Sequence, residues 1–182
     1  GRIYFSDPRY GSRAGMEMIE GVYRIDAPGK VVRVLGSGEV NRPNGVLVSR
    51  DGHLLYVADN NNDVGGVRKL WCFRLNPNGS VDTKSRRLIF DWGDSRGPDG
   101  LKSDTTGTLY VAAGLNRAHP PQETNTRKGG IYVISPEGKL LRFIPITDDE
   151  VTNCAFGGED GRTLFITAGG NLWSLRLEAR GW

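Results

Sequence analysis

Three oxygen-bearing side chains recur at one position of a pattern that the chain repeats. Asn44 stands in a Pro-Asn-Gly segment, Asp99 stands in a Pro-Asp-Gly segment, and Asn153 follows at a nearly equal interval. Calcium prefers carboxylate and amide oxygens and tolerates irregular coordination. The spacing therefore predicts a divalent-metal site to which Asn44 and Asp99 contribute, with Asn153 as a weaker member of the set.

Each of these segments also has a plainer interpretation. Pro-Asn-Gly and Pro-Asp-Gly are frequent turn sequences, and the amide of Asn153 could equally tie down a loop. Turns taken singly have no reason to recur at one register of a repeat. The metal interpretation is therefore preferred for Asn44 and Asp99, while both interpretations of Asn153 stay open.

The elements that must position these side chains come from a fourfold repeat. Each copy has a polar turn, then a β-branched and aromatic run, then small residues. The copies are Gly1–Asp7, Gly52–Asp59, Gly107–Ala113 and Gly161–Ala168, and they begin at nearly equal intervals. A long period with only strands and turns inside it is typical of β-propeller blades. Equivalent positions of successive blades meet at one central channel, so residues there converge.

The rest of the chain supports an all-β fold. No window shows a sustained helical period, and strand-like runs follow one another from Ile3–Ser6 to Leu172–Leu177. The 182 residues are 37% hydrophobic, which suffices for one core. We predict one domain over residues 1–182, with about three complete four-stranded blades and a partial one.

Composition excludes some function classes. Net charge is +3, and the densest basic stretch, Lys84–Arg87, is too short to argue for nucleic acid. The longest apolar runs have strand length, so no transmembrane helix is predicted. Cys72 and Cys154 stand in strand-like contexts without metal spacing, and we expect them to be small buried hydrophobes.

Two other motifs do not hold up. Gly93–Gly97 fits G-x-S-x-G, but no helix follows it, and neither histidine stands in triad order. Asp59–Asp63 resembles the start of an EF-hand loop, yet Val64 and Leu70 occupy the positions that demand Gly and Glu. Asp59–Asp63 is expected to be a polar turn after the strand, with a channel-side or second-metal role as the alternative.

Two further residues are weak candidates for contacting a substrate or supporting the site. Asp7 directly follows the strand of the first repeat copy. His119 belongs to a long loop after a strand, where it could line a pocket or simply be exposed to solvent.

The ordered set of motifs resembles the SMP-30/gluconolactonase/LRE-like family over essentially the whole chain. The segments that carry the resemblance are Tyr4–Gly11, Gly21–Arg24, Arg42–Gly45 with Leu55–Asp59, Gly97–Gly100, and Cys154–Gly158 with Thr163–Thr167. The resemblance implies a six-bladed propeller that holds a divalent metal in its channel. The expected metal is Ca²⁺, with Zn²⁺, Mn²⁺ or Mg²⁺ as alternatives. It also implies hydrolysis of a lactone or sugar-derived ester, with Asn44 as metal ligand and Asp99 as metal ligand and catalytic general base.

The chain also departs from that family. The family's N-terminal metal Glu belongs to a blade that these residues do not contain, and about two blades are expected to be missing. Open blade faces would then favour self-association, and the chain alone would be weakly active. A non-catalytic propeller that binds a sugar, a metal or a protein on its channel face is the alternative function. The cellular compartment stays open.

Overall fold

The protein, in a computed structural model, is described at residues 1–11, 15 and 18–182, which form fourteen strands. The first sheet contains β1 (Ile3–Asp7), β2 (Gly21–Ala27) and β3 (Lys30–Leu35). The second contains β4 (Pro43–Val48), β5 (Leu54–Asn60), β6 (Arg68–Leu75) and β7 (Val81–Asp91). The third contains β8 (Leu101–Ser103), β9 (Leu109–Ala113), β10 (Gly130–Ile134) and β11 (Leu140–Pro145). The fourth contains β12 (Val151–Gly157), β13 (Thr163–Ala168) and β14 (Asn171–Arg176). None of the described residues belongs to a helix that could cross a lipid bilayer.

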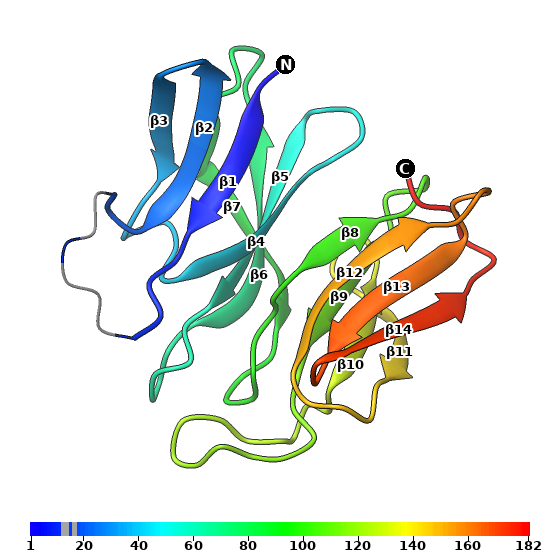
Figure 1. Cartoon of the computed structure of the whole chain (residues 1–182). Coiled ribbons are helices and arrows are strands. Elements are labelled where there is room, and N and C mark those ends of the chain that lie inside the picture. The colour runs from blue at the N-terminus through cyan, green and yellow to red at the C-terminus, as the bar shows by residue number, and fades with distance from the viewer. Residues whose placement is uncertain (12–14, 16–17) are drawn as a thin grey trace.

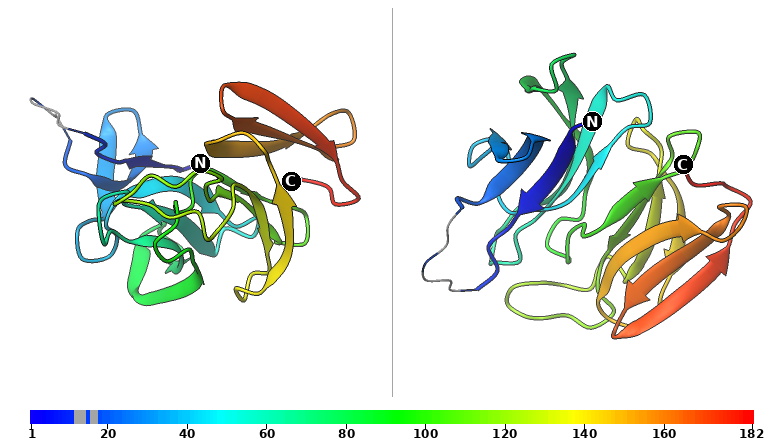
Figure 2. Two further views of the ribbon diagram at one scale, coloured as in Figure 1. Left: turned by 90° about the horizontal axis from the view of Figure 1, so that it is seen from below. Right: turned by 45° about the horizontal axis from the view of Figure 1, so that its top comes forward.

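The four sheets follow one another in an arc, as propeller blades do (Figure 1). Within each sheet the strands are antiparallel and pair in chain order. The inner side of the arc is formed by β1, β4, β8 and β12, each in contact with the next. The first and last sheets lie at its two ends (Figure 2). The all-β propeller prediction is confirmed.

The predicted division into blades is wrong in one respect. The described residues form two four-stranded and two three-stranded sheets, not three complete blades and a partial one. The repeat explains the difference, because β1 carries the same repeat segment as β5, β9 and β13. The first sheet thus lacks, among the described residues, a strand equivalent to β4. The fourth sheet likewise lacks an outermost strand there.

Period-two alternation builds three cores between the four sheets. Along β5, Leu55 and Val57 pack against the first sheet, whereas Tyr56 and Ala58 pack against the third. Along β9 the same alternation sends Leu109 and Val111 toward the second sheet, and Tyr110 and Ala112 toward the fourth. Successive side chains of a strand point to opposite faces. The two middle sheets are therefore buried on both faces.

The two end sheets keep one open face each. Exposed apolar side chains on these sheets are Ile3 (60%), Val31 (48%) and Val32 (45%) on the first, and Leu172 (70%) and Trp173 (37%) on the fourth.

The cysteine prediction is confirmed. Cys72 is buried between the second and third sheets, Cys154 is buried between the third and fourth, and both are free thiols. Burial raises the pKa of Cys154 to about 12, so this thiol stays protonated and inert.

Candidate functional site

The Pro-Asn-Gly segment opens β4 and the Pro-Asp-Gly segment directly precedes β8, and neither forms a turn, so the turn interpretation is wrong. Asn44 lies within β4. The Asp99 amide donates to the Ala112 carbonyl at 2.9 Å, which continues the pairing of β8 with β9. The Gly100 amide donates to the Thr152 carbonyl at 2.8 Å and so links the third sheet to the fourth.

The two glycines allow the inner strands to approach one another. A Cβ on Gly45 would lie 2.2 Å from the backbone oxygen of Asp99, and a Cβ on Gly100 would lie 2.1 Å from Oδ1 of Asn153. No side chain fits at such separations. These close approaches bring Asn44, Asp99 and Asn153 to neighbouring positions on the inner side of the arc.

One open pocket of about 300 Å³ brings together Asn44, Asp99 and Asn153. Its polar lining includes Ser6, Asn44, Asp99, Lys102 and Asn153. A larger hollow of about 520 Å³ lies between Ser49–Asp51 and Thr105–Gly107, but it holds none of the predicted site residues. The smaller pocket is therefore the candidate site.

Among the described residues that line this pocket, Asp99 is the carboxylic acid. Its carboxyl is largely buried, and burial raises its pKa to about 6 against the opposing charge of Arg96. Nearby Glu150 also raises this pKa, whereas hydrogen bonding with the Asn44 amide lowers it. Nη2 of Arg96 lies 3.1 Å from Oδ2 of Asp99. A carboxylate that ionises near neutral pH in a cleft is suited to taking a proton from water.

Asn44 is held in place by a tyrosine whose role the sequence did not indicate. Its Nδ2 donates to Oη of Tyr10 at 3.0 Å, and that hydroxyl donates to the Asn60 carbonyl at 3.1 Å. Burial raises the pKa of Tyr10, so the phenol stays neutral. Because Nδ2 is engaged, Oδ1 of Asn44 is the atom left to act as a ligand.

The other predicted residues divide between pocket and periphery. Asn153 lines the pocket and is exposed, but its Oδ1 also accepts the Cys154 amide at 2.9 Å. Asp7 lies at the end of β1, opposite Gly21, and is not among the residues that line the pocket.

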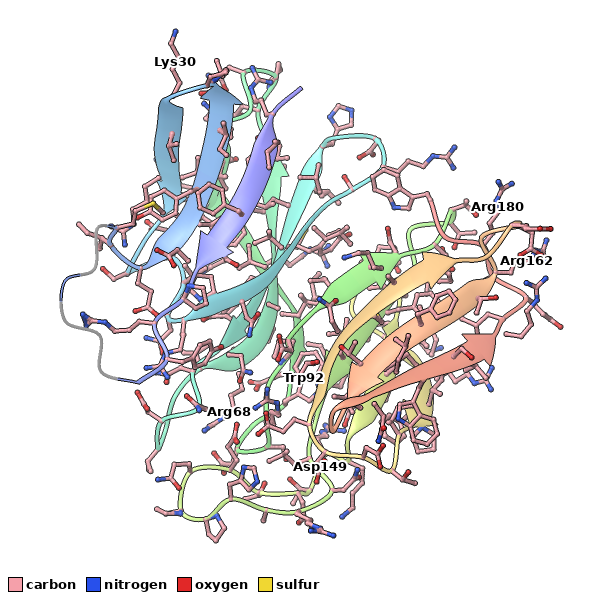
Figure 3. The ribbon with its side chains drawn as sticks, in the orientation of Figure 1. Lys30, Arg68, Trp92, Asp149, Arg162 and Arg180 are labelled. Atoms are coloured by element: carbon pink, nitrogen blue, oxygen red, sulfur yellow. The ribbon has the colours of Figure 1, made fainter. Side chains whose placement is uncertain are left out.

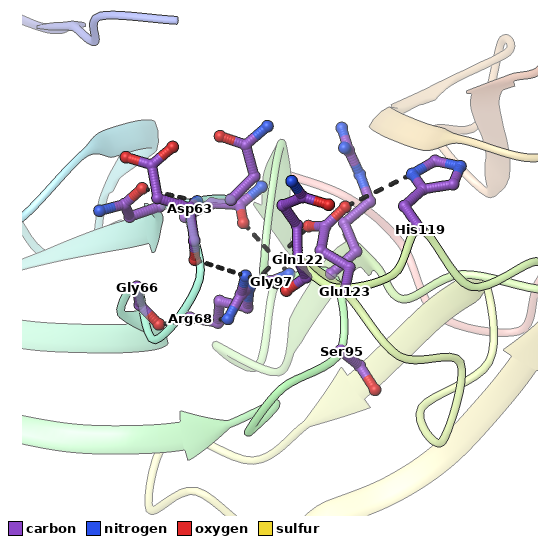
Figure 4. Close-up of polar contacts among 12 residues, drawn as sticks. Asp63, Gly66, Arg68, Ser95, Gly97, His119, Gln122 and Glu123 are labelled. Atoms are coloured by element: carbon purple, nitrogen blue, oxygen red, sulfur yellow. Dashed lines mark hydrogen bonds and ion pairs between the residues drawn. The ribbon is translucent and has the colours of Figure 1, made fainter.

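His119 lies outside the pocket lining but is connected to it by charged groups. Its ring is 49% exposed, and Nδ1 lies 3.6 Å from Oε2 of Glu123 (Figure 4). The same nitrogen lies 4.0 Å from Oε1 of Glu150. Arg96 in turn joins Glu150 to Asp99, with Nη1 of Arg96 3.0 Å from Oε2 of Glu150.

Neither of the other two motifs forms a site. Ser95 of G-x-S-x-G is fully buried, and its hydroxyl bonds to Thr124, Thr126 and the Arg127 amide. Asp59 of the EF-hand-like segment is buried and accepts the amides of Asn41 and Arg42. Both therefore hold loops together.

The six side chains labelled in Figure 3 lie toward two opposite ends of the molecule. Arg68, Trp92 and Asp149 lie toward the end that carries the loops after β5, β7 and β11, whereas Lys30, Arg162 and Arg180 lie toward the opposite end (Figure 3). Asp149 ties that loop end together by accepting the amides of Asn116 and Arg117.

The donor chemistry of Asn44 and Asp99 fits part of a hard-cation site. They supply one amide and one carboxylate, whereas calcium takes about six to eight oxygen ligands. In the described part of the chain, no group of three or more His, Cys, Asp or Glu side chains gathers in a way that could hold a metal. These residues can therefore provide only part of a coordination sphere.

Comparison with known proteins identifies the family. The SMP-30/gluconolactonase/LRE-like region matches residues 1–170. A gluconolactonase of Zymomonas mobilis is 30% identical over 193 residues, which covers 100% of this chain and 49% of that protein. A gluconolactonase structure from Xanthomonas campestris aligns with a TM-score of 0.74 at 30% identity, covering 97% of this chain and 54% of that one. Regucalcin of Agrobacterium tumefaciens, described as a calcium-binding protein, shares the fold with a TM-score of 0.69 at 20% identity, covering 89% and 54% of the two chains. The chain spans about half the length of these relatives, and it belongs to the SMP-30/gluconolactonase/LRE-like family.

Proposed function

We propose that the pocket around Asp99 serves the metal-assisted hydrolysis of a sugar-type lactone. The observation that carries the proposal is the meeting in one pocket of Asn44, at the start of β4, and Asp99, just before β8. Relatives named gluconolactonase and 6-deoxy-6-sulfogluconolactonase support this substrate class. Asp99 is proposed as catalytic base and metal ligand, Asn44 as metal ligand, and Asn153 as a contact for the substrate.

In this mechanism Asp99 takes a proton from water as the water oxygen attacks the lactone carbonyl carbon. The C–O bond between the carbonyl carbon and the ring oxygen then breaks, and the ring oxygen leaves as a hydroxyl by taking back the proton that Asp99 received from water. A bound divalent cation, with Ca²⁺ the first candidate, would polarise the lactone carbonyl. Asn44 orients its amide oxygen through the bond to Tyr10. No covalent nucleophile of the protein is needed.

The assay that tests this function uses sugar lactones with added calcium, followed by a chelator. We expect chelation to abolish hydrolysis, and Asn44→Ala to weaken calcium binding by about tenfold or more, because one oxygen ligand is lost. Asn78→Ala, in the turn between β6 and β7, is the control and should bind calcium as the native chain does. Hydrolysis that persists in excess chelator would contradict the proposal. Ligand binding without turnover would favour a non-catalytic propeller.

Since the chain spans half of its relatives, we propose that the isolated 182 residues hydrolyse lactones slowly or not at all. The assay therefore also uses any longer form that the upstream coding sequence provides. Full metal-dependent turnover by the isolated chain would refute this part of the proposal.

We also propose that the open faces of the two end sheets associate with a second copy or with further blades of the same protein. Exposed apolar side chains such as Leu172 and Ile3 favour burial at about 25 cal/mol per Å². Size-exclusion chromatography with light scattering should therefore show that the isolated chain is not a monomer. Leu172→Lys is expected to shift it toward the monomer, whereas Val64→Lys, at an exposed loop position, should not. A monodisperse native monomer would rule the association out.

A further inference from the structure

Arg96 occupies an unusual place, because its single guanidinium is shared between two carboxylates. It lies in the loop between β7 and β8, where its carbonyl accepts the Gly114 amide at 3.1 Å. Nη2 lies 3.1 Å from Oδ2 of Asp99, and Nη1 lies 3.0 Å from Oε2 of Glu150. The Arg96 side chain is only 11% exposed. Glu150 directly precedes β12, so the contact bridges the third and fourth sheets.

The guanidinium of Arg96 divides its two terminal nitrogens between two carboxylates and leaves its third nitrogen without a hydrogen-bond partner among the described residues. Each carboxylate receives one terminal nitrogen, so neither pair has the bidentate geometry that makes arginine–carboxylate pairs strong. Nε of Arg96 is buried and has no hydrogen-bond partner among the described residues. Glu150 is 39% exposed and can accept further bonds. The same arginine could thus pair fully with Glu150 if Asp99 were taken by another cation.

In the described part of the chain, Arg96 is the residue that forms an ion pair with Asp99. Lys102 also lines the pocket, but its ammonium donates to the Leu101 carbonyl at 3.1 Å. His119 approaches Glu150, not Asp99. Arg96 therefore balances the charge of the buried Asp99 carboxylate.

We propose that Arg96 is a positioning residue that serves as the resident counter-ion of Asp99, and that a divalent cation must displace it toward Glu150 in order to bind. This inference rests on the proposed metal role of Asn44 and Asp99. A guanidinium and a metal ion repel one another at contact distance in a partly buried site. With Arg96 in place, Asp99 is not left as an unpaired buried charge when the cation is absent. Arg96 thereby lowers cation affinity and keeps the empty site ordered.

The decisive experiment measures cation binding instead of turnover. Calcium is titrated by calorimetry into the folded chain, and terbium is titrated by its luminescence, which Tyr10 beside Asn44 should sensitise. Arg96→Gln is expected to bind both cations about tenfold more tightly than the native chain, because a competing positive charge is gone. Arg96→Met, which keeps the apolar stem, provides a second variant should the first fail to fold. Lys102→Gln removes a charge from the same pocket without touching Asp99, and should tighten binding much less.

Substitution of Glu150 should change cation affinity in the direction opposite to substitution of Arg96. Glu150→Gln weakens the alternative partner of Arg96, so cation affinity should fall severalfold. If Glu150 acts through Arg96, most of that fall should vanish when Arg96→Gln is also present.

Native-like or weaker cation affinity in both Arg96 variants would overturn this inference alone, provided that Asp99→Ala, which lacks the carboxylate oxygens, abolishes cation binding. The same holds for a Glu150 effect that is equally large without Arg96. If the native chain binds neither cation and the Arg96 variants do not either, the proposed metal site and this inference fall together. Tight binding that appears only after Arg96 is replaced supports the inference in its strongest form.

Discussion

Asp99→Asn is expected to lower lactone turnover by about 10²–10⁴-fold, which is the usual contribution of a positioned general base. The amide keeps the size of the side chain and an oxygen for a ligand, but it cannot accept a proton from water. The measurement is kcat with a sugar lactone at saturating calcium, in the longest active form of the protein. Asp94→Asn, in the exposed part of the same loop, is the matched control and should turn over normally. Turnover within threefold of native in Asp99→Asn would remove Asp99 from the mechanism.

The same substitution should change how stability depends on pH. The pKa of Asp99 is raised from 3.8 to about 6 in the folded chain, chiefly by burial and against the charge of Arg96. Its folded-state pKa lies above the unfolded one, so ionisation opposes folding. The loss of folding stability that ionisation of Asp99 causes is absent below about pH 4 and grows as pH rises to about 6. Above that pH it is complete, at about 3 kcal/mol as an upper bound.

Urea denaturation of native chain and variant at pH 4 and pH 7.5 tests this linkage. We expect Asp99→Asn to gain stability relative to the native chain as pH rises between these values. An identical pH dependence in both proteins would show that Asp99 ionises in the folded chain as it does in the unfolded one. Asp99 would then lack the raised pKa that suits it to act as a base near neutral pH.

How far the sequence predicts this structure depends on whether the relevant contacts are periodic. The strands follow from alternation: Leu55 and Val57 face one neighbouring sheet, and Tyr56 and Ala58 face the other. The convergence of Asn44 and Asp99 follows from their shared register in the repeat. The pocket also admits Asn153, although both interpretations of that residue retain support, because its amide oxygen bonds to its own strand.

What the sequence does not predict are contacts between loops of different blades. Arg96 stands inside the G-x-S-x-G segment, in which the motif points to Ser95 as the functional residue. Glu150 is the last of three consecutive acidic residues, and the sequence does not distinguish it from the other two. Nothing in their positions along the chain marks them as partners. Tyr10 and the buried Arg68 are likewise defined by tertiary contacts. The glycines at 45 and 100 resemble turn residues, although their actual requirement is the close approach of neighbouring inner strands.

Arg68→Met is expected to cause a large loss of stability. Arg68 is 1% exposed, and its guanidinium donates to the carbonyls of Asp63, Gly66 and Gln122 (Figure 4). Its Nε lies 3.9 Å from Oε1 of Glu123, which is 4% exposed. The substitution leaves these carbonyls without their donor and leaves the buried Glu123 carboxylate without its arginine partner. Breaking a buried pair in this way costs about 3–5 kcal/mol.

The matched control lies on the same strand. Arg74 pairs with Asp82 at 2.9 Å, but its side chain is 71% exposed, so Arg74→Met should cost less than about 1 kcal/mol. Urea denaturation of both variants gives the comparison. Glu123→Gln should cost less than Arg68→Met, since Arg68 keeps its three carbonyl acceptors. In Arg68→Met combined with Glu123→Leu, part of the loss of stability should be recovered, because no buried charge remains unpaired.

The loop that Arg68 holds also carries His119, so hydrogen exchange in residues 115–127 should rise in Arg68→Met and stay native in Arg74→Met. If Arg68→Met proved no more destabilising than Arg74→Met, the buried guanidinium could not be what anchors this loop beside the pocket.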